Sequence, residues 1–166
     1  SLPQRESLDN IAYLANFSIG QGELLLSPAA MLTLYCAAAY DGSYALPTAV
    51  AGTLAGGKFT PTAERGRTRV MAAETAKKLR EYLSAVITEG TGKAAAPKTV
   101  SAAGKTATAQ TGRYEKGKEI CEGWFCGFFP AEEPQYTVIV FSENTEKQTK
   151  SCAEIFAAIA DRLSEK

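Results

Sequence analysis

The order of apolar and polar residues along the chain predicts three helices. Residues 29–40 are apolar nearly all round and follow a serine–proline pair that favours a helix start, so we expect a helix buried on most sides. In residues 71–89 the apolar positions recur at spacings of three and four, as in an amphipathic helix. Ser151 and Glu154 have the spacing of a capping box and open a last amphipathic helix.

Three segments between the second and the third predicted helix have the composition of β-strands. Residues 100–110 are rich in threonine and alanine, residues 123–129 are aromatic, and residues 136–141 are β-branched and apolar. Turn-forming residues separate them, so we expect three antiparallel strands. Residues 1–17 and 43–69 show no clear period and are interpreted as irregular. This order of elements predicts an α+β fold, with an antiparallel sheet packed with helices.

The charge and composition of the chain exclude several functions. Its 18 basic and 18 acidic side chains balance, so no electrostatic field argues for a nucleic-acid partner. The 166 residues are 45% hydrophobic and suffice for a single domain with a hydrophobic core. The sequence contains no histidine, which excludes a histidine-based catalytic triad and most zinc sites. We expect neither a metal nor another cofactor.

The four cysteines form no recognisable metal or redox motif. None lies in a Cys-x-x-Cys pair, and Cys36 and Cys152 fall in apolar patterns, which favours buried thiols. The sequence alone leaves a disulfide open. No apolar run reaches the ~20 residues of a transmembrane helix, and Ser1 does not begin a recognisable signal peptide.

The segment with the clearest chemical character is residues 104–112, GKTATAQTG. In an extended strand, Lys105 and Ala107 point to one face and Thr106 and Thr108 to the other, but the twist of an edge strand can bring them to one groove. A cation with hydroxyl groups and free backbone N–H groups suits a carboxylate ligand. The alternative is an exposed strand with an ordinary solvated lysine, and these residues alone do not decide between the two.

Other segments give this motif a context. Residues 105–112 resemble the K-T-G-T-A-Q motif of penicillin-binding proteins, the serine D,D-transpeptidases that cross-link peptidoglycan. Residues 18–42 resemble the family's I-G-Q-G, T-P-L-Q and A-N-G-G stretch, and residues 74–95 resemble its next helix and G-T-G turn. Residues 123–140 are similar to its W-F-x-G-x-x-P strand and the strand that follows. The resemblance covers about residues 15–160, in the family's order.

The resemblance implies that residues 1–166 are the C-terminal part of a transpeptidase domain with the fold of penicillin-binding proteins and serine β-lactamases. By position, Lys105 would be a catalytic residue that joins the serine in a proton-relay network and attracts an anionic peptide end. Thr106, Ala107 and Thr108 would bind the substrate, with the two hydroxyls holding the carboxylate of the peptide or of a β-lactam. The Thr108 backbone N–H would be one of two oxyanion-hole donors.

Ala107 departs from the family pattern, which has glycine at this position. Glycine allows close approach of a backbone. We therefore expect the added methyl group either to narrow the groove or to be absorbed by a small shift of the strand.

The family's nucleophile is missing from the sequence. No serine has a lysine three residues later, and the nearest pattern, Thr75-x-x-Lys78, is expected on a helix surface. Ser142-Glu143-Asn144 is the one Ser-x-Asn sequence, but it follows the lysine strand and is interpreted as a turn. Covalent catalysis needs a nucleophile held beside its base. We therefore expect a truncated fragment that is inactive alone.

The leading hypothesis is a fragment of a peptidoglycan transpeptidase. Its partners would be peptidoglycan stem peptides and β-lactams, and an N-terminal segment would anchor the full-length parent at the extracytoplasmic face of a bacterial membrane. The alternatives are a class D β-lactamase or related β-lactam sensor, which share a K-T-G strand, and a non-catalytic peptidoglycan-binding module. Residues 74–95 favour the transpeptidase over the β-lactamase.

Two structural expectations concern the last predicted strand, which should have an unpaired edge, and Trp124. In the family, the strand that corresponds to residues 136–141 pairs with an N-terminal strand that this chain lacks. A bare apolar edge favours pairing with another chain, so we expect self-association there or coverage by residues 1–17. Trp124 is expected to pack in the core behind the sheet with its aromatic neighbours.

Overall fold

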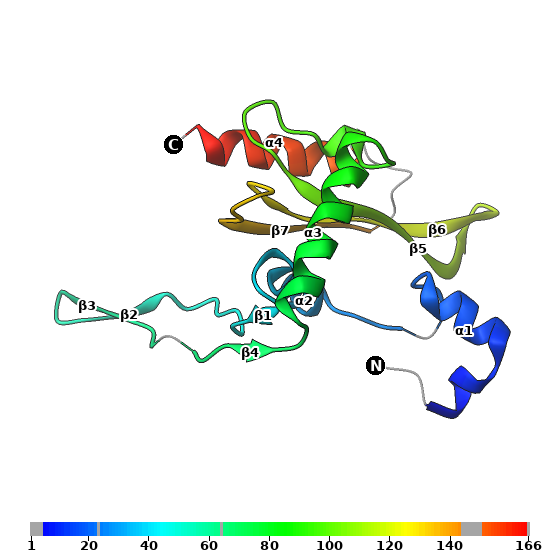
Figure 1. Ribbon diagram of the computed structural model, residues 1–166, viewed down its shortest axis with the longest axis horizontal. Helices are drawn as coiled ribbons and strands as arrows, with labels where there is room; N and C mark the ends of the chain where they lie inside the picture. Colours follow the sequence, from blue (N-terminus) through cyan, green and yellow to red (C-terminus); the bar gives the residue numbers. More distant parts are fainter. Residues whose placement is uncertain (1–4, 23, 64, 144–150, 166) are drawn as a thin grey trace.

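The computed structural model describes residues 5–22, 24–63, 65–143 and 151–165. Figure 1 shows a central sheet with helices around it, and two smaller pairs of strands beyond α2. The elements of the described residues are, in chain order, η1 (Arg5–Asp9), α1 (Ile11–Ser18), α2 (Pro28–Ala39), β1 (Ser43–Tyr44), β2 (Gly52–Ala55), β3 (Lys58–Pro61), β4 (Thr68–Arg69), α3 (Ala73–Thr88), η2 (Lys93–Ala95), β5 (Ala103–Glu115), β6 (Lys118–Phe129), β7 (Tyr136–Ser142) and α4 (Cys152–Ser164).

The central sheet consists of three antiparallel strands in the order β5-β6-β7. Helix α4 covers one face of β6 and β7, and α2 packs against the same strands from the other face (Figure 1). Helix α3 contacts β5 and α2, and it runs across the direction of the strands (Figure 1). The predicted α+β fold is therefore confirmed. Strands β5 and β6 are longer than predicted because they continue together as a hairpin beyond the helices.

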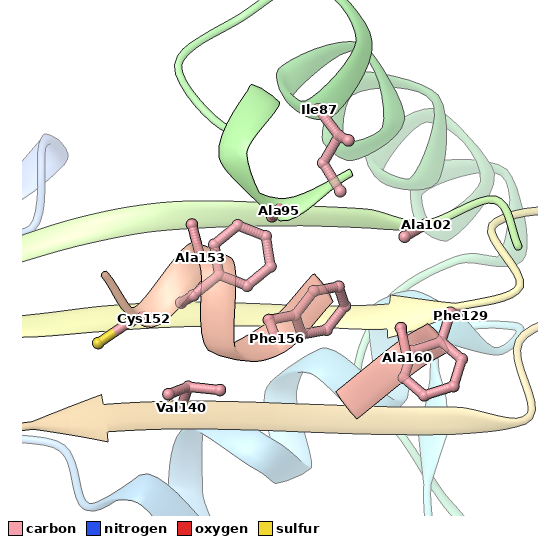
Figure 2. Packing of buried hydrophobic residues seen from close by; sticks show 10 residues of the cluster. Ile87, Ala95, Ala102, Phe129, Val140, Cys152, Ala153, Phe156 and Ala160 are labelled. Atoms are coloured by element: carbon pink, nitrogen blue, oxygen red, sulfur yellow. The ribbon is translucent and has the colours of Figure 1, made fainter. Parts of the chain in front are cut away.

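The main hydrophobic core lies between the sheet and α4 (Figure 2). The ring centroid of Phe156 on α4 lies 4.6 Å from that of Phe125 and 5.8 Å from that of Phe129, both on β6. Burial of side chains of this size stabilises a fold by about 1.5–3 kcal/mol each. The predicted capping box is present, because Ser151 and Glu154 each accept a hydrogen bond from the other's backbone N–H. It fixes the start of α4 over the sheet.

Asp161 of α4 holds the loop that leads into β5. Its Oδ1 accepts hydrogen bonds from the Lys98 N–H at 2.6 Å and from the Thr99 N–H and hydroxyl, each at 3.0 Å. Partial desolvation acts to raise the pKa of Asp161, but the hydrogen bonds outweigh it and hold the pKa below its usual value. Helix α4 thereby fixes the entry of the strand that carries Lys105.

Both ends of α2 are held by side chains. At its start, Ser27 Oγ accepts a hydrogen bond from the Ala30 N–H at 3.2 Å, as the predicted N-cap requires. At its end, the guanidinium group of Arg80 on α3 donates to three carbonyl oxygens, those of Ala38, Ala39 and Tyr40. A cation at this end of a helix also interacts favourably with the helix dipole. The contact fixes α2 relative to α3.

The expectation that α2 is buried on most sides is wrong. Its buried residues are Ala37–Ala39, whereas Leu34 is 47% exposed. The helix contacts β6, β7, α3 and β1, but its buried residues are confined to the last turn. Neither α2 nor any other helix of the described residues is long and apolar enough to cross a membrane.

The prediction that residues 1–17 are irregular is wrong for the part that the structure describes. After η1, the Asn10 side chain accepts hydrogen bonds from the N–H groups of Ala12 and Tyr13 and caps α1. No residue of α1 is buried, and its eight residues are too few for a helical period of apolar positions to stand out in the sequence. The described part of this segment does not pair with β7, whose hydrogen-bonded neighbour in the described sheet is β6.

Residues 43–69 also contain more regular structure than predicted. Strands β2 and β3 form a hairpin that turns through Gly56 and Gly57, both with positive φ, and β1 pairs with β4. Arg69 Nη2 lies 2.7 Å from Asp41 Oδ2. Hydrogen bonds from Ser43 and then Arg69 lower the pKa of Asp41 to about 2. The strands are short and exposed, so an alternating pattern of burial does not mark them.

Candidate functional site

The lysine–threonine segment lies on β5, at the outer edge of the central sheet. Lys105 is opposite Cys126 and Ala107 is opposite Trp124, and the pairing with β6 is regular from Ala103 to Gln110. Lys105 and Ala107 therefore share one face of the sheet with Cys126 and Trp124. The pairing shows no slip of register at Ala107.

The ammonium group of Lys105 bends toward the residue that follows it. Nζ donates a hydrogen bond to the Thr106 carbonyl at 2.8 Å and lies 3.4 Å from Thr106 Oγ1. The two side chains start on opposite faces, so they meet around the outer edge of the strand, as the twist argument predicts. The Thr106 carbonyl thus faces this edge. Backbone groups of alternate residues in an antiparallel strand point the same way, so the Thr108 N–H faces it as well.

Thr91 is a neighbour of the site that the sequence did not single out. It lies in the turn between α3 and η2, and its Oγ1 is 3.4 Å from Thr106 Oγ1. The backbone N–H of Gly92 donates to the Val86 carbonyl at 2.9 Å and so holds this turn against the end of α3. The similarity of residues 74–95 to the family's G-T-G turn was the signal that could have located Thr91.

A cavity of about 490 Å³ opens beside this segment. The four predicted site residues all contribute to its wall: Lys105, Thr106, Ala107 and Thr108. The rest of the wall is mostly apolar and includes Met31 and Tyr35 of α2 and five residues of the segment before it: Ile19, Gly20, Gln21, Leu24 and Leu26. A largely apolar cavity with a few polar groups on one wall is typical of a ligand site. The structure therefore brings the predicted site residues together.

Trp124 lines the same cavity, and the expectation that it packs behind the sheet is wrong. It is half-buried, its ring centroid lies 4.4 Å from that of Phe141, and it stands opposite Ala107. The error arose because alternation along β6 places Phe125 against α4 and sends Trp124 to the opposite face. The Ala107 methyl group and the indole thus border the cavity together.

Two further titratable groups line the cavity and stay uncharged near neutral pH. Burial raises the pKa of the Cys126 thiol to about 12, with a further contribution from Cys152. Burial also raises the pKa of the Tyr35 phenol, with a contribution from Cys126. The thiolate is the nucleophilic form of cysteine, so Cys126 is not a nucleophile here. All four cysteines are free thiols.

None of the described residues that line the cavity is a serine. Thr75 and Lys78 lie exposed on α3, as predicted. Ser142 ends β7, where a turn was expected to begin, while Asn144 lies outside the described residues. Within the described ranges, acidic and cysteine side chains do not form a group of three or more that could hold a metal ion. This wall of the cavity offers a cation, hydroxyls and backbone donors.

Known proteins match almost the whole chain. Residues 3–161 match the family model described as the penicillin binding protein transpeptidase domain. The chain is 32% identical over 139 residues to the peptidoglycan D,D-transpeptidase MrdA of Acinetobacter baumannii, a match that covers 76% of this chain and 21% of that protein. It is 30% identical over 165 residues to penicillin-binding protein PbpB of Mycolicibacterium smegmatis, over 90% of this chain and 25% of that protein.

Solved structures agree with the sequence matches. The imipenem acyl-enzyme complex of penicillin-binding protein A from M. tuberculosis superposes with a TM-score of 0.75 at 26% identity, over 94% of this chain and 35% of that one. The D,D-transpeptidase domain of a peptidoglycan glycosyltransferase from Eggerthella lenta gives a TM-score of 0.68 at 28% identity. That match covers 84% of this chain and 32% of the other. The chain thus spans about a quarter or less of the curated relatives named above. Since residues 3–161 match its model, the chain belongs to the family of penicillin-binding protein transpeptidase domains.

Proposed function

We propose that this chain supplies the substrate-binding strand of a peptidoglycan D,D-transpeptidase. The observation that carries the proposal is the position of Lys105, Thr106 and Thr108 on an open strand edge that also forms one wall of a cavity. Membership of the transpeptidase family supports the assignment. A fold hosts many activities, so the arrangement of these side chains weighs more than the fold.

Each of the three residues takes a different part in binding. The Lys105 ammonium adds positive potential for the anionic end of a stem peptide and holds the hydroxyl groups of the catalytic machinery in a proton-relay network. The hydroxyls of Thr106 and Thr108 donate hydrogen bonds to the carboxylate of the peptide or of a β-lactam. The Thr108 N–H is one of two donors to the oxyanion.

The nucleophile is a serine in a part of the transpeptidase that this chain does not contain. Its Oγ bonds to the carbonyl carbon of the scissile peptide, and the oxygen that becomes negative accepts a hydrogen bond from the Thr108 N–H. The C–N bond then breaks, the terminal residue leaves as an amine that has taken up the serine proton, and an acyl-serine ester remains. The amine of a second stem peptide attacks this ester and forms the cross-link. Without the serine, this chain is inactive.

The complete protein acts at the extracytoplasmic face of a bacterial membrane, where stem peptides are cross-linked, with its anchor outside this chain. Its ligands are stem peptides and β-lactams. The names of the curated relatives, a peptidoglycan transpeptidase and a penicillin-binding protein, support this location and substrate. The imipenem acyl-enzyme formed by a structural relative supports β-lactam binding. A class D β-lactamase or β-lactam sensor is the weaker candidate, because the matching family model is a transpeptidase domain.

Fluorescent penicillin tests the proposal directly. We expect it to label the complete protein that contains this segment and to leave the isolated chain unlabelled, because the isolated chain has no serine at the cavity. Lys105→Met removes the charge and keeps most of the side-chain volume, so the rate of labelling of the complete protein should fall by about 100-fold or more. The rate is read from gel fluorescence over time.

The matched control is Lys93→Met, which removes an exposed lysine from η2, away from the cavity wall. It should label at the wild-type rate. Labelling of the isolated chain would contradict the need for an external serine. A folded complete protein that takes up no label at all would instead identify a non-catalytic peptidoglycan-binding module.

A further inference from the structure

Beyond the candidate site, β5 departs from regular pairing with β6. The register is continuous up to the pair Gln110 and Cys121, and it resumes at the pair Tyr114 and Glu119. Residues 111–113 of β5 therefore stand opposite the single residue Ile120. Such a bulge bends a strand and interrupts its ladder of hydrogen bonds. The straight part of β5 ends immediately after the residues that line the cavity.

The carboxylate of Glu119 closes this bulge with two hydrogen bonds. Oε2 accepts from the Gln110 side-chain amide at 3.0 Å, and Oε1 accepts from the Gly112 backbone N–H at 3.1 Å. Gly112 has a φ of 67°, a conformation that glycine adopts without strain. Thr111 adds a third contact, because its hydroxyl donates to the Ile120 carbonyl. Glu119 thus joins both ends of the bulge.

The open edge of β5 also has a defined start, at the end opposite the bulge. Ala102, Ala103 and Gly104 are buried, and the Thr91 hydroxyl approaches Thr106 from the turn after α3. Beyond that point every residue of the stretch 105–110 is exposed or half-buried. The accessible edge therefore runs from Lys105 to Gln110, about 17 Å at the rise of an antiparallel strand.

We propose that Glu119 is a positioning residue that ends and orients the substrate-binding strand. Through Gln110 and Gly112 it holds the bend of β5, so that Thr106, Thr108 and Gln110 present the last backbone groups of the regularly paired strand that are available for pairing. The ligand class that fits is a short extended peptide, since only three alternate residues of the strand face the open edge. This inference rests on the proposed function, but the geometry of the bulge can be tested without it.

The two oxygens of Glu119 explain which substitutions should matter. Alanine removes both acceptors and leaves the Gly112 N–H and the Gln110 amide without them. Glutamine keeps one oxygen for the Gly112 N–H, and its amide group can donate to Gln110 once the Gln110 amide has turned over. A role that depends on geometry is therefore rescued by glutamine, whereas a role that depends on charge is not.

Amide hydrogen exchange on this chain tests the bulge. We expect Glu119→Ala to speed exchange at Gly112 by about tenfold or more and to move the amide resonances of Thr108, Ala109 and Gln110. Glu119→Gln should restore the wild-type exchange rate and the wild-type resonance positions. Glu133→Ala, which removes an exposed carboxylate beyond the other end of β6, controls for net charge. Unchanged exchange and resonances in Glu119→Ala would overturn the inference.

Acylation of the complete protein by penicillin tests the positioning role. Glu119→Ala should lower the second-order rate by about tenfold, mainly by raising the dissociation constant of the non-covalent complex, because the carboxylate-binding hydroxyls are displaced. Glu119→Gln should recover most of the rate. An equal loss of acylation rate in Glu119→Ala and Glu119→Gln, or no loss in either variant, would refute the positioning role of Glu119. If the wild-type protein is not acylated, the proposed function fails, while the exchange measurement still decides whether Glu119 holds the strand.

Discussion

Gly104 and Gly127 face each other across β5 and β6 and leave room for an aromatic ring. A Cβ built on Gly104 would lie 2.7 Å from the Phe125 ring and 2.7 Å from the Cys126 carbonyl oxygen, and one built on Gly127 would lie 2.6 Å from the Ala103 carbonyl oxygen. All three distances are shorter than non-bonded atoms tolerate. The absence of side chains at these two positions therefore lets the Phe125 ring pack against the strand that carries Lys105.

We expect Gly104→Ala to destabilise the chain by about 1–3 kcal/mol, because the ring or the strand has to move. Urea unfolding followed by tryptophan fluorescence measures the loss. Gly66→Ala is the matched control, since a Cβ there would have no heavy atom within 4 Å. Equal stability of the Gly104 variant and the control would show that the core absorbs the methyl group freely.

At the scale of elements, the arrangement of α2 and α3 depends on one side chain. Arg80 projects from α3 onto the carbonyl groups that end α2, where unpaired acceptors and the negative end of the helix dipole meet. Since α2 forms part of the cavity wall and α3 contacts β5, this contact helps to fix the width of the cavity.

Arg80→Ala should lower the free energy of unfolding by about 0.5–2 kcal/mol, because the end of α2 loses its donors. Thermal unfolding followed by circular dichroism tests this expectation. Lys78→Ala removes an exposed cation from the same helix and should change stability little. The interpretation fails if both substitutions have the same effect.

The elements that the sequence predicts well are those with a one-sided pattern or a clear cap. Helix α4 has both, and the sheet strands carry threonine, aromatic and β-branched residues. Helix α1 is missed because no residue of it is buried, and the β2–β3 hairpin is missed because nearly all of it faces solvent. An element with no buried face does not need a periodic pattern of apolar and polar residues, so its sequence does not mark it.

The site residues on β5 could be predicted because they are contiguous along one strand. Thr91 had only the similarity of residues 74–95 to the family's G-T-G turn as a signal, and Glu119 had none, since its role depends on a contact between residues that only the folded chain brings together. The face of Trp124 was predicted wrongly because composition marks an aromatic strand without showing which of its residues point to which helix. Site residues that depend on contacts between elements therefore cannot be predicted from the sequence alone.

At the scale of the whole molecule, apolar side chains are exposed close to the cavity. Ile19 and Leu25, in the segment between α1 and α2, are 74% and 71% exposed, and Ile11 on α1 is 84% exposed. The edge of β7 is open in the described sheet, although α2 and α4 pack against the strand from its two faces.

We expect the isolated chain to self-associate through the β7 edge, because an open apolar strand pairs readily with another chain. Light scattering after size exclusion should show a dimer or larger species that dissociates on dilution. Tyr136→Lys places a charge at an exposed position of this strand and should favour the monomer. Tyr82→Lys, at an exposed position on α3, should not. A monodisperse monomer at every concentration would argue against pairing.

The ring of Phe125 has a consequence for how the protein should be handled. It lies beneath Gly104, one residue before Lys105, and its other contact is Phe156 in the final helix. We therefore expect a movement of α4 to be transmitted through packed aromatic rings to the strand that carries Lys105. An affinity tag, fusion partner or protease cut that disturbs α4 should shift the residues of β5, so additions are better placed away from this helix.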